Sequence, residues 1–525
     1  MSAFQHLVNR VLADRPDPSA MKRWAGSLSL LLLISSFSFL WRLGDRGVDS
    51  EAEAALVREA FGAGPRPEVP PLHAWCMNAA ASATGGASLE AMRLPGALAA
   101  VALTLLLFAL GRRTLGDRAA LLSGVVFATS VGAIVSARVA GPDVLIALGV
   151  FVSAVALYEA ALAPVWWGIA ALSTAATFLA GGVAAALLPL GGHLIHAAVR
   201  REGEERLAVG AIASLGACAA IATIAVPFAT GGTTGLWPTS LPGDLAGRVA
   251  EGGAQAAWAI LLSLAPWVMF LPGVVAGLLR APDSRREPSV FLLSAASAVV
   301  VGGAWGRWPA ARLAVVALPF LASAVALFWD RTSEVEDPRR VRFSVGLPFV
   351  LFLLALPTAG FLFIMRGREA LPGCPSAAPG AGVFLILVGN ALIVLLFRRQ
   401  TFLRIAALGA TSMVTLGFAM TSVMPRIEDC GGERRFYAEV GERVSAQEAL
   451  RTLRQPSGAA YMRRGDLGDL AQVDDAASLL AGPECAYCVM DFDDLLALQE
   501  RGMSGLRVVH QGRVKGRTLA LVSNR

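Results

Sequence analysis

The sequence predicts an α-helical integral membrane protein of about thirteen transmembrane helices, with a small α/β domain outside the cytoplasm. Of its 525 residues, 55% are hydrophobic and only 16% are charged, whereas a soluble domain carries about a quarter of its residues as charged ones. Apolar runs of about twenty residues recur through the first 424 positions, and each is long enough to cross a bilayer as a helix.

The ends of these apolar runs define the expected spans. They cover residues 24–41, 94–110, 119–137, 143–162, 164–181, 182–199, 207–229, 256–279, 288–304, 311–329, 343–365, 382–397 and 403–424. We therefore expect a cytoplasmic N-terminal lead at 1–23, a transmembrane domain at 24–424 with its first outer loop at 42–93, and an outer domain at 425–525.

The basic residues predict the orientation of the spans. With a cytoplasmic N-terminus, twenty basic residues between Arg10 and Arg404 fall on the inner side. Apart from the first loop and the C-terminal domain, the outer side holds six, namely Arg138, Arg248, Arg307, Arg312, Arg366 and Arg368. This is the positive-inside asymmetry of short loops, so we expect the N-terminus inside and the C-terminus outside.

The charges also exclude some classes of protein. The net charge of +6 follows from this topology, and no basic stretch is interleaved with aromatic residues, so nucleic acid is not an expected partner. No basic residue lies well inside a span, and of the acids only Glu159 comes close. Transporters usually keep such charges for ion pathways and often contain paired broken helices, neither of which we find, so a transporter or channel is disfavoured.

Acidic and arginine side chains gather instead on the expected outer face. The first outer loop carries Asp45, Asp49, Glu51, Glu53, Glu59 and Glu68 together with Arg42, Arg46, Arg58, Arg66 and Arg93. Carboxylates can accept a proton or hold a metal ion, and arginine pairs with phosphate oxygens. Any single one of these is more simply a solvated loop charge, but the grouping indicates chemistry on a phosphate-linked substrate.

Several motifs between residues 41 and 150 carry a resemblance. They are Asp49-Ser50-Glu51, Arg58-Glu59, Glu68-Val69-Pro70-Pro71-Leu72-His73-Ala74-Trp75, Arg93-Leu94-Pro95 and Arg138-Val139-Ala140-Gly141-Pro142-Asp143. In their order and spacing the chain resembles the bacterial polyprenyl-phosphate-dependent glycosyltransferases of the GT-C fold, above all aminoarabinose transferases and protein O-mannosyltransferases. Beyond residue 150 the resemblance is mainly architectural.

The resemblance implies a glycosyltransferase of the bacterial inner membrane. It would move a sugar from a polyprenyl-phosphate donor to a cell-envelope acceptor (lipid A, protein or glycan) on the periplasmic face. It gives Asp49 the role of general base, with Asp143 and Glu68 positioning substrate or a divalent cation, the one cofactor expected. The expected substrate-binding residues are Arg58, Arg93, Arg138, Glu51 and Arg66.

Each of these roles has a structural alternative. Asp143, after Gly141-Pro142, can act as a helix N-cap. The arginines can instead orient the loop through salt bridges with Glu59 and Glu90. His73 is the candidate metal ligand, although a lone histidine on a Trp-bearing helix is more often packed or anchored at the interface.

Three departures from the family pattern keep a second function open. The lysine of the family's Glu-Lys-Pro turn is Val69, its Lys-Gly pair after the fifth span is Gly181-Gly182, and the approach to the tenth span reads Trp305-Gly306-Arg307-Trp308-Pro309. Arg66 or Arg307 would have to replace the lysines at the donor phosphate. Otherwise the chain is a catalytically degenerate GT-C-like scaffold that binds lipid-linked glycans.

After Pro425 the composition becomes that of a soluble domain. The capping box at Ser445–Glu448 predicts a helix through about Arg454. Further helices are expected at 466–480 and 491–500, and strands at 458–463, 485–490, 504–510 and 517–522. The outer compartment permits disulfides, for which Cys485 with Cys488 and Cys374 with Cys430 are the candidate pairs.

Overall fold

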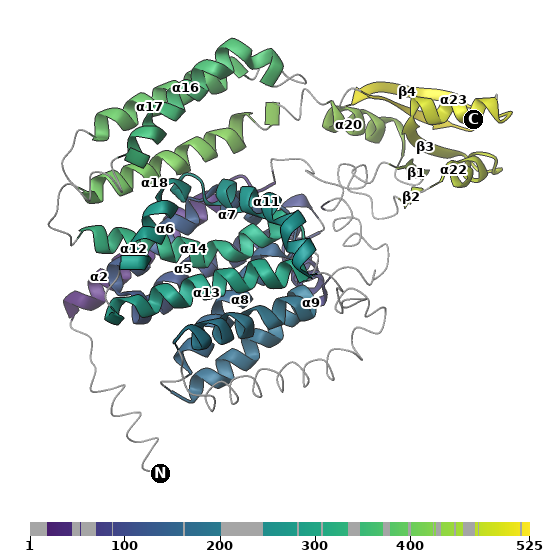
Figure 1. Ribbon diagram of the computed structural model, residues 1–525. Helices are drawn as coiled ribbons and strands as arrows, with labels where there is room; N and C mark the ends of the chain where they lie inside the picture. Colours follow the sequence, from purple (N-terminus) through teal and green to yellow (C-terminus); the bar gives the residue numbers. More distant parts are fainter. Residues whose placement is uncertain are drawn as a thin grey trace.

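The computed structural model describes residues 18–44, 53, 70–86, 88–160, 163–200, 245–280, 283–305, 308–333, 347–370, 378–396, 401–423, 425–426, 432–445, 448–454, 468–470, 472–503, 505–514 and 517–525. The described residues as far as Val423 are mainly helical, and a β-sheet with its own helices follows (Figure 1). The predicted span 207–229 and residues 45–52 and 54–69 of the first outer loop lie outside the described residues.

The helices of the larger part follow the apolar runs of the sequence. They are α2 (Pro18–Leu40), α4 (Pro71–Ala83), α5 (Leu89–Leu115), α6 (Asp117–Ala128), α7 (Val131–Ala137), α8 (Asp143–Glu159), α9 (Val165–Arg200), α11 (Leu245–Leu264), η2 (Trp267–Phe270), α12 (Leu271–Arg280), α13 (Asp283–Trp305), α14 (Ala310–Ser333), α16 (Leu347–Ala370), α17 (Ala378–Leu396), α18 (Thr401–Phe418) and η4 (Ala419–Val423).

Three of these helices are apolar and long enough to cross a membrane by themselves. Within the described residues they are Leu89–Leu115, Val165–Ala198 and Ala310–Arg331, and the number rises to five if each of two bent helix pairs forms one span. Shorter apolar helices occur at several other predicted spans, including Trp24–Leu40 and Pro288–Gly303. The described helices agree with a membrane protein, and the count of thirteen stays a prediction.

Two of the predicted spans are broken rather than continuous. α6 and α7 meet at 59°, and the segment Gln255–Leu264 meets Trp267–Val275 at 105°. Sequence analysis expected continuous helices at 119–137 and 256–279. The first break contains Thr129 and Ser130, neither of which is a strong helix breaker, and the second contains Pro266 within an apolar run.

The two breaks supply hydrogen bonds to each other. The Val131 amide N–H donates to the Ala265 carbonyl at 3.0 Å, and the Trp267 Nε1–H donates to Thr129 Oγ1 at 3.1 Å. From α18, the Ser412 hydroxyl donates to the Thr129 carbonyl at 2.5 Å. Backbone groups released by a bend in an apolar setting need such partners, so each bend is stabilised by the other.

The predicted boundary between the spans 164–181 and 182–199 is a kink within α9. Gly182 has φ 73° and ψ −167° there, outside the helical region. A positive φ of this kind is accessible to glycine without the steric cost of a Cβ. The glycine pair in the sequence therefore marks a true interruption of the helix.

Helix α14 lies at the centre of the described bundle. It packs against α6, α8, α11 and α13, and its side chains from Val315 to Phe320 are buried almost without exception. Its N-terminal residues, including Arg312, are consequently held close to the beginning of α8. This placement builds the site described below.

The C-terminal sheet has the strand order β2-β1-β3-β5-β4. Its strands are β1 (Ala449–Leu453), β2 (Gly468–Leu470), β3 (Ala486–Asp491), β4 (Arg507–Val514) and β5 (Arg517–Ser523). β1 pairs in parallel with β2 and β3, while β5 is antiparallel to β3 and β4. The helices α20 (Glu433–Arg443), α22 (Val473–Leu480) and α23 (Phe492–Glu500) accompany it, and the whole group lies beside the helical part in Figure 1.

Two predicted elements of this region are wrong, one in part and one as a whole. The helix expected at 466–480 begins only at Val473, because Gly468–Leu470 pairs in parallel with β1 as strand β2. The Ser445–Glu448 segment does form half of a capping box, since the Ser445 amide N–H donates to the Glu448 carboxylate at 2.7 Å. It leads into strand β1 rather than a helix, because Leu450 and Leu453 are fully buried in the sheet between β2 and β3. The predicted strand 458–463 lies outside the described residues.

The cysteine pair of the sheet is not bridged. Cys485 and Cys488 both remain thiols, and Cys488 on β3 is buried in the core beneath α22 and α23. Successive side chains of a strand point to opposite faces, which separates the two sulfur atoms. Cys374 and Cys430 lie outside the described residues.

Candidate functional site

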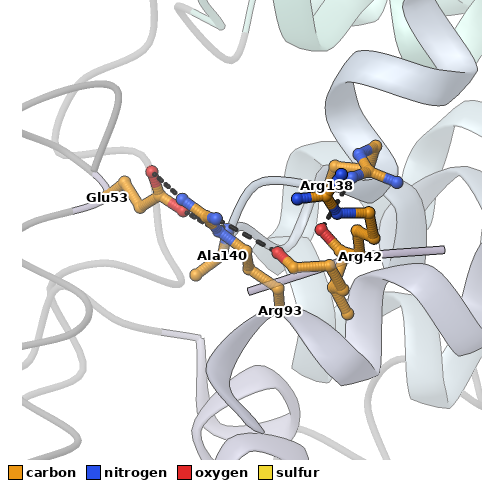
Figure 2. A network of polar contacts seen from close by, with 6 residues as sticks. Arg42, Glu53, Arg93, Arg138 and Ala140 are labelled. Atoms are coloured by element: carbon orange, nitrogen blue, oxygen red, sulfur yellow. Dashed lines mark hydrogen bonds and ion pairs between the residues drawn. The ribbon is translucent and has the colours of Figure 1, made fainter. Parts of the chain in front are cut away.

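Arg93 is buried at the beginning of α5 and holds together two parts of the first outer loop. Its Nε donates to Glu53 Oε1 at 2.9 Å and one terminal nitrogen donates to Glu53 Oε2 at 3.3 Å. The other terminal nitrogen donates to the Leu43 carbonyl at 3.3 Å. Both side chains of the ion pair have 0% exposure. Figure 2 shows this fork from close by.

Glu53 accepts a third hydrogen bond, from another element. Its Oε1 accepts a hydrogen bond of 2.9 Å from the Ala140 amide N–H, in the connection between α7 and α8. A buried carboxylate is tolerable only when it is paired and hydrogen-bonded. Since the Arg93 fork and the Ala140 amide provide this, the loop, α5 and the α7–α8 connection are fixed to one another.

Arg138 follows α7 and caps the end of the first helix. Its two terminal nitrogens donate to the Trp41 carbonyl at 2.7 Å and to the Arg42 carbonyl at 3.0 Å, and the side chain is buried. Arg42 itself has a φ of 53°. A cation at the last carbonyls of a helix is favourable because it satisfies free acceptors and opposes the helix dipole.

Asp143 forms an ion pair with an arginine that lies far away in the sequence. Its Oδ1 accepts from Arg312 Nε at 2.6 Å, and each side chain is 27% exposed. The N-cap of α8 is Pro142, so Asp143 is its first helical residue, and the expected N-cap role is wrong. Arg312 also lies over the ring of Trp308, with 5.8 Å from its Cζ to the ring centroid.

His73 on α4 is fully buried near this pair. Neither ring nitrogen has a hydrogen-bond partner among the described residues. Burial, and after it the positive charge of Arg312, lowers the pKa of His73 to about 4. The ring is therefore neutral at physiological pH, with one N–H donor and one acceptor nitrogen.

The described residues do not support a metal ion at His73. No group of three or more His, Cys, Asp or Glu side chains in the described ranges could hold one. The nearby charge that acts on His73 is the cation Arg312, and a second cation there would be repelled. A neutral imidazole can itself ligate a metal, so a cation is disfavoured here by the Arg312 charge and by the lack of further ligands among the described residues.

The structure brings together only part of the predicted site. Arg93, Arg138, Asp143 and His73 are described, and the first two turn their donors towards the protein itself. Asp49, Glu51, Arg58, Arg66 and Glu68 lie outside the described residues, so their predicted convergence with Asp143 stays a prediction. The geometry at Arg93 is that of the loop-orienting alternative, with Glu53 as the partner in place of Glu90.

Two residues of this region were not predicted from the sequence to have a role in the site. Glu53 was one of several loop acids without an assigned role, and Arg312 was one of six basic residues on the outer side. Arg312 did leave a signal, because it is an exception to the positive-inside pattern at the outer end of a span. By the positive-inside pattern, an arginine without a role would be expected on the inner side of the membrane.

The comparisons with known proteins agree with this architecture. Residues 68–229 match the profile of the dolichyl-phosphate-mannose-protein mannosyltransferase family. The crystal structure of ArnT from Cupriavidus metallidurans bound to undecaprenyl phosphate matches with a TM-score of 0.73 at 17% identity, covering 96% of this chain and 98% of that one. The apo state of ArnT matches with a TM-score of 0.73 at 16% identity, covering 97% and 98%.

A third solved structure is more distant. The oligosaccharyltransferase of Archaeoglobus fulgidus in complex with Zn and sulfate gives a TM-score of 0.49 at 13% identity, with 90% of this chain and 69% of that chain covered. No curated protein sequence matches the chain significantly.

The protein thus has the helical fold of the GT-C membrane glycosyltransferases, and the resemblance predicted from its sequence is confirmed. Within that class its fold is the fold of ArnT over nearly the whole length of both chains.

Proposed function

We propose that this protein transfers a sugar from a polyprenyl-phosphate donor to a cell-envelope acceptor, on the extracytoplasmic side of a bacterial inner membrane. The observation that carries the proposal is the partly exposed Asp143–Arg312 pair with His73 buried beside it. On an ArnT-like fold, this pair joins a carboxylate and a guanidinium where two apolar helices begin.

The chemistry of the pair suits a lipid-linked phosphate. Within the described part of the chain, the Nε of Arg312 is its only nitrogen with a hydrogen-bond partner, so its two terminal nitrogens face no competing acceptor. Guanidinium forks bind phosphate oxygens through such paired donors. Arg312 therefore takes the role of phosphate partner that sequence analysis gave to other arginines.

The remaining roles follow from the needs of glycosyl transfer. The acceptor hydroxyl loses a proton as it attacks the anomeric carbon, and the phosphate leaves with the electrons of the broken C–O bond. Asp49 accepts that proton as general base, while Arg312 stabilises the departing phosphate. Asp143 orients Arg312, and Glu68 helps to position the substrate.

The divalent cation allowed by the sequence carries no step of this mechanism. At His73 the described residues fit it poorly, for the electrostatic reason given above. Its remaining candidate ligands are Asp49 and Glu68, together with Asp143, which is already paired with Arg312. Turnover measured with and without EDTA tests the cation directly.

The test is reconstitution of the purified protein in liposomes with a panel of polyprenyl-phosphate sugars. We expect release of polyprenyl phosphate with at least one donor, and a loss of at least about a hundredfold in Asp49→Asn, since general base catalysis contributes factors of this size. Arg112→Gln serves as control, because this arginine is in an exposed ion pair with Asp117 on the predicted inner side.

A second function has one observation in its favour. Arg93 and Arg138 are directed to protein acceptors and two family lysines are replaced, as a scaffold that binds lipid-linked glycans without turnover would allow. Binding of a polyprenyl-phosphate sugar without release of polyprenyl phosphate, for every donor tested, would establish the scaffold and exclude the enzyme.

A further inference from the structure

The ion pair of Glu53 and Arg93 brackets the stretch of chain that contains Asp49. One guanidinium binds the Leu43 carbonyl on one side of this stretch and the Glu53 carboxylate on the other. Residues 44–52 lie between the two contacts. The Arg93 side chain of α5 therefore holds the two residues that flank the segment, Leu43 and Glu53.

The residues that flank this segment are also attached to the rest of the site. Glu53 Oε1 accepts from the Ala140 amide at 2.9 Å, three residues before Asp143. Arg138 holds the carbonyls of Trp41 and Arg42 immediately before Leu43. Both ends of the segment are consequently tied to the connection that leads into α8.

Chain length limits how far Asp49 can lie from this anchor. Asp49 lies four positions before Glu53, and an extended chain spans at most about 3.5 Å per residue, or roughly 14 Å in all. The anchor thus holds a point of the chain only four positions from Asp49. Catalytic groups need this control, because misplacement by about 1 Å can cost a hundredfold in rate.

We propose that Glu53 and Arg93 are positioning residues that form a clamp, defined by Glu53, Arg93, the Leu43 carbonyl and the Ala140 amide, which holds the chain on both sides of the segment containing Asp49 to α5 and to the α7–α8 connection. The inference rests on the proposed glycosyltransferase function. It separates these two side chains from substrate binding, since their polar groups are used within the protein and are shielded from solvent.

The variants Glu53→Gln, Arg93→Gln and Arg93→Lys test the clamp in the full-length protein in liposomes. We expect kcat to fall by about tenfold to a hundredfold while the KM for the polyprenyl-phosphate sugar changes by less than about twofold, as for a lost transition-state interaction. Arg93→Lys should behave like Arg93→Gln, because one ammonium group cannot reproduce the planar fork to two acceptors. Arg112→Gln, at the other end of α5, should leave both constants unchanged.

Hydrogen exchange gives a readout that needs no activity. The Ala140 amide donates to Glu53, so the peptide covering residues 138–142 should exchange faster in all three clamp variants and at the wild-type rate in Arg112→Gln. Because a Gln side chain keeps an acceptor oxygen, Glu53→Leu is measured as well, and unchanged exchange in Glu53→Leu would contradict the clamp itself. Faster exchange with unchanged kcat, or a rise in KM with unchanged kcat, would overturn the positioning role. An inactive wild-type protein would instead refute the proposed function, and the two failures are therefore distinct.

Discussion

Asp143 and Arg312 are 169 positions apart in the sequence and their side chains meet at 2.6 Å, Oδ1 to Nε. The contact joins the first turn of α8 to the first turn of α14. At 27% exposure on each side the pair is open enough to meet a ligand and sheltered enough to keep its geometry.

This pair should matter more for turnover than for stability. A partly exposed ion pair contributes at most about 1 kcal/mol to folding, whereas loss of a phosphate partner acts directly on the transition state. We expect Arg312→Gln to reduce kcat/KM by about a hundredfold with little change in unfolding temperature. Asp143→Asn should have a smaller effect in the same direction. An equal loss of kcat/KM in the control variant Arg112→Gln would contradict a specific role of Arg312 in turnover.

Arg138 can either stabilise the end of α2 or bind the donor phosphate, and one variant distinguishes these two roles. Loss of two charge-assisted hydrogen bonds to the end of α2 should destabilise the protein by about 1.5–3 kcal/mol per bond to the charged group. The donor KM should stay within about twofold, because the side chain binds carbonyls and not substrate. Thermal unfolding and steady-state kinetics of Arg138→Gln provide the measurement. A large rise in donor KM without loss of stability would favour phosphate binding.

His73 makes the stability of the protein depend on pH. Its pKa is about 4 in the folded protein and about 6.5 in the unfolded chain, so between these values the unfolded state binds a proton that the folded state does not. Stability therefore falls as the pH is lowered through 6.5, by about 2 kcal/mol at pH 5.

A variant in which leucine replaces His73 isolates the contribution of this side chain to the pH dependence of stability. His73→Leu cannot bind the proton, so its unfolding temperature should decrease less than that of the wild type between pH 7.5 and pH 5. Equal decreases in the two proteins would show that His73 is protonated in the folded state. A gain in turnover at low pH in the variant is not expected.

Gly132 tests the packing of α7 against α11. A Cβ at this position would lie 2.4 Å from the Cβ of Ser263 and 2.9 Å from its Cα, and backbone atoms cannot yield cheaply. We expect Gly132→Ala to destabilise the protein by about 1–3 kcal/mol. Gly168→Ala on α9 is the control, because nothing lies within 4 Å of its Cβ position. Equal unfolding temperatures for the two variants would show that α7 can shift away.

The sequence predicted those features that depend on local or one-dimensional patterns. The apolar runs gave the places of most helices, the Gly181-Gly182 pair gave the kink in α9, and the motif ending at Asp143 gave the beginning of α8. Each of these depends on neighbouring residues only. Hydropathy in a membrane is informative because the backbone must satisfy itself within the helix.

The missed features depend on contacts between distant residues. Nothing near Glu53 distinguishes it from the other acids of the loop, and its partner Arg93 is 40 positions away. The capping box at Ser445 formed its hydrogen bond, yet burial of Leu450 and Leu453 in the sheet decided the outcome. The breaks at Thr129 and Ala265 likewise become stable only when they meet. Tertiary contacts overrode local propensity in each case.

The hydrogen bond from Ser412 to the Thr129 carbonyl has a consequence for biosynthesis. A ribosome completes Ser412 only after translating a further 283 residues beyond Thr129. Until α18 has entered the bilayer, the bend between α6 and α7 lacks this donor, and the connection that carries Arg138 and Ala140 is not fully supported. The bend between α6 and α7 therefore gains this hydrogen bond only after the helices up to α18 have been translated.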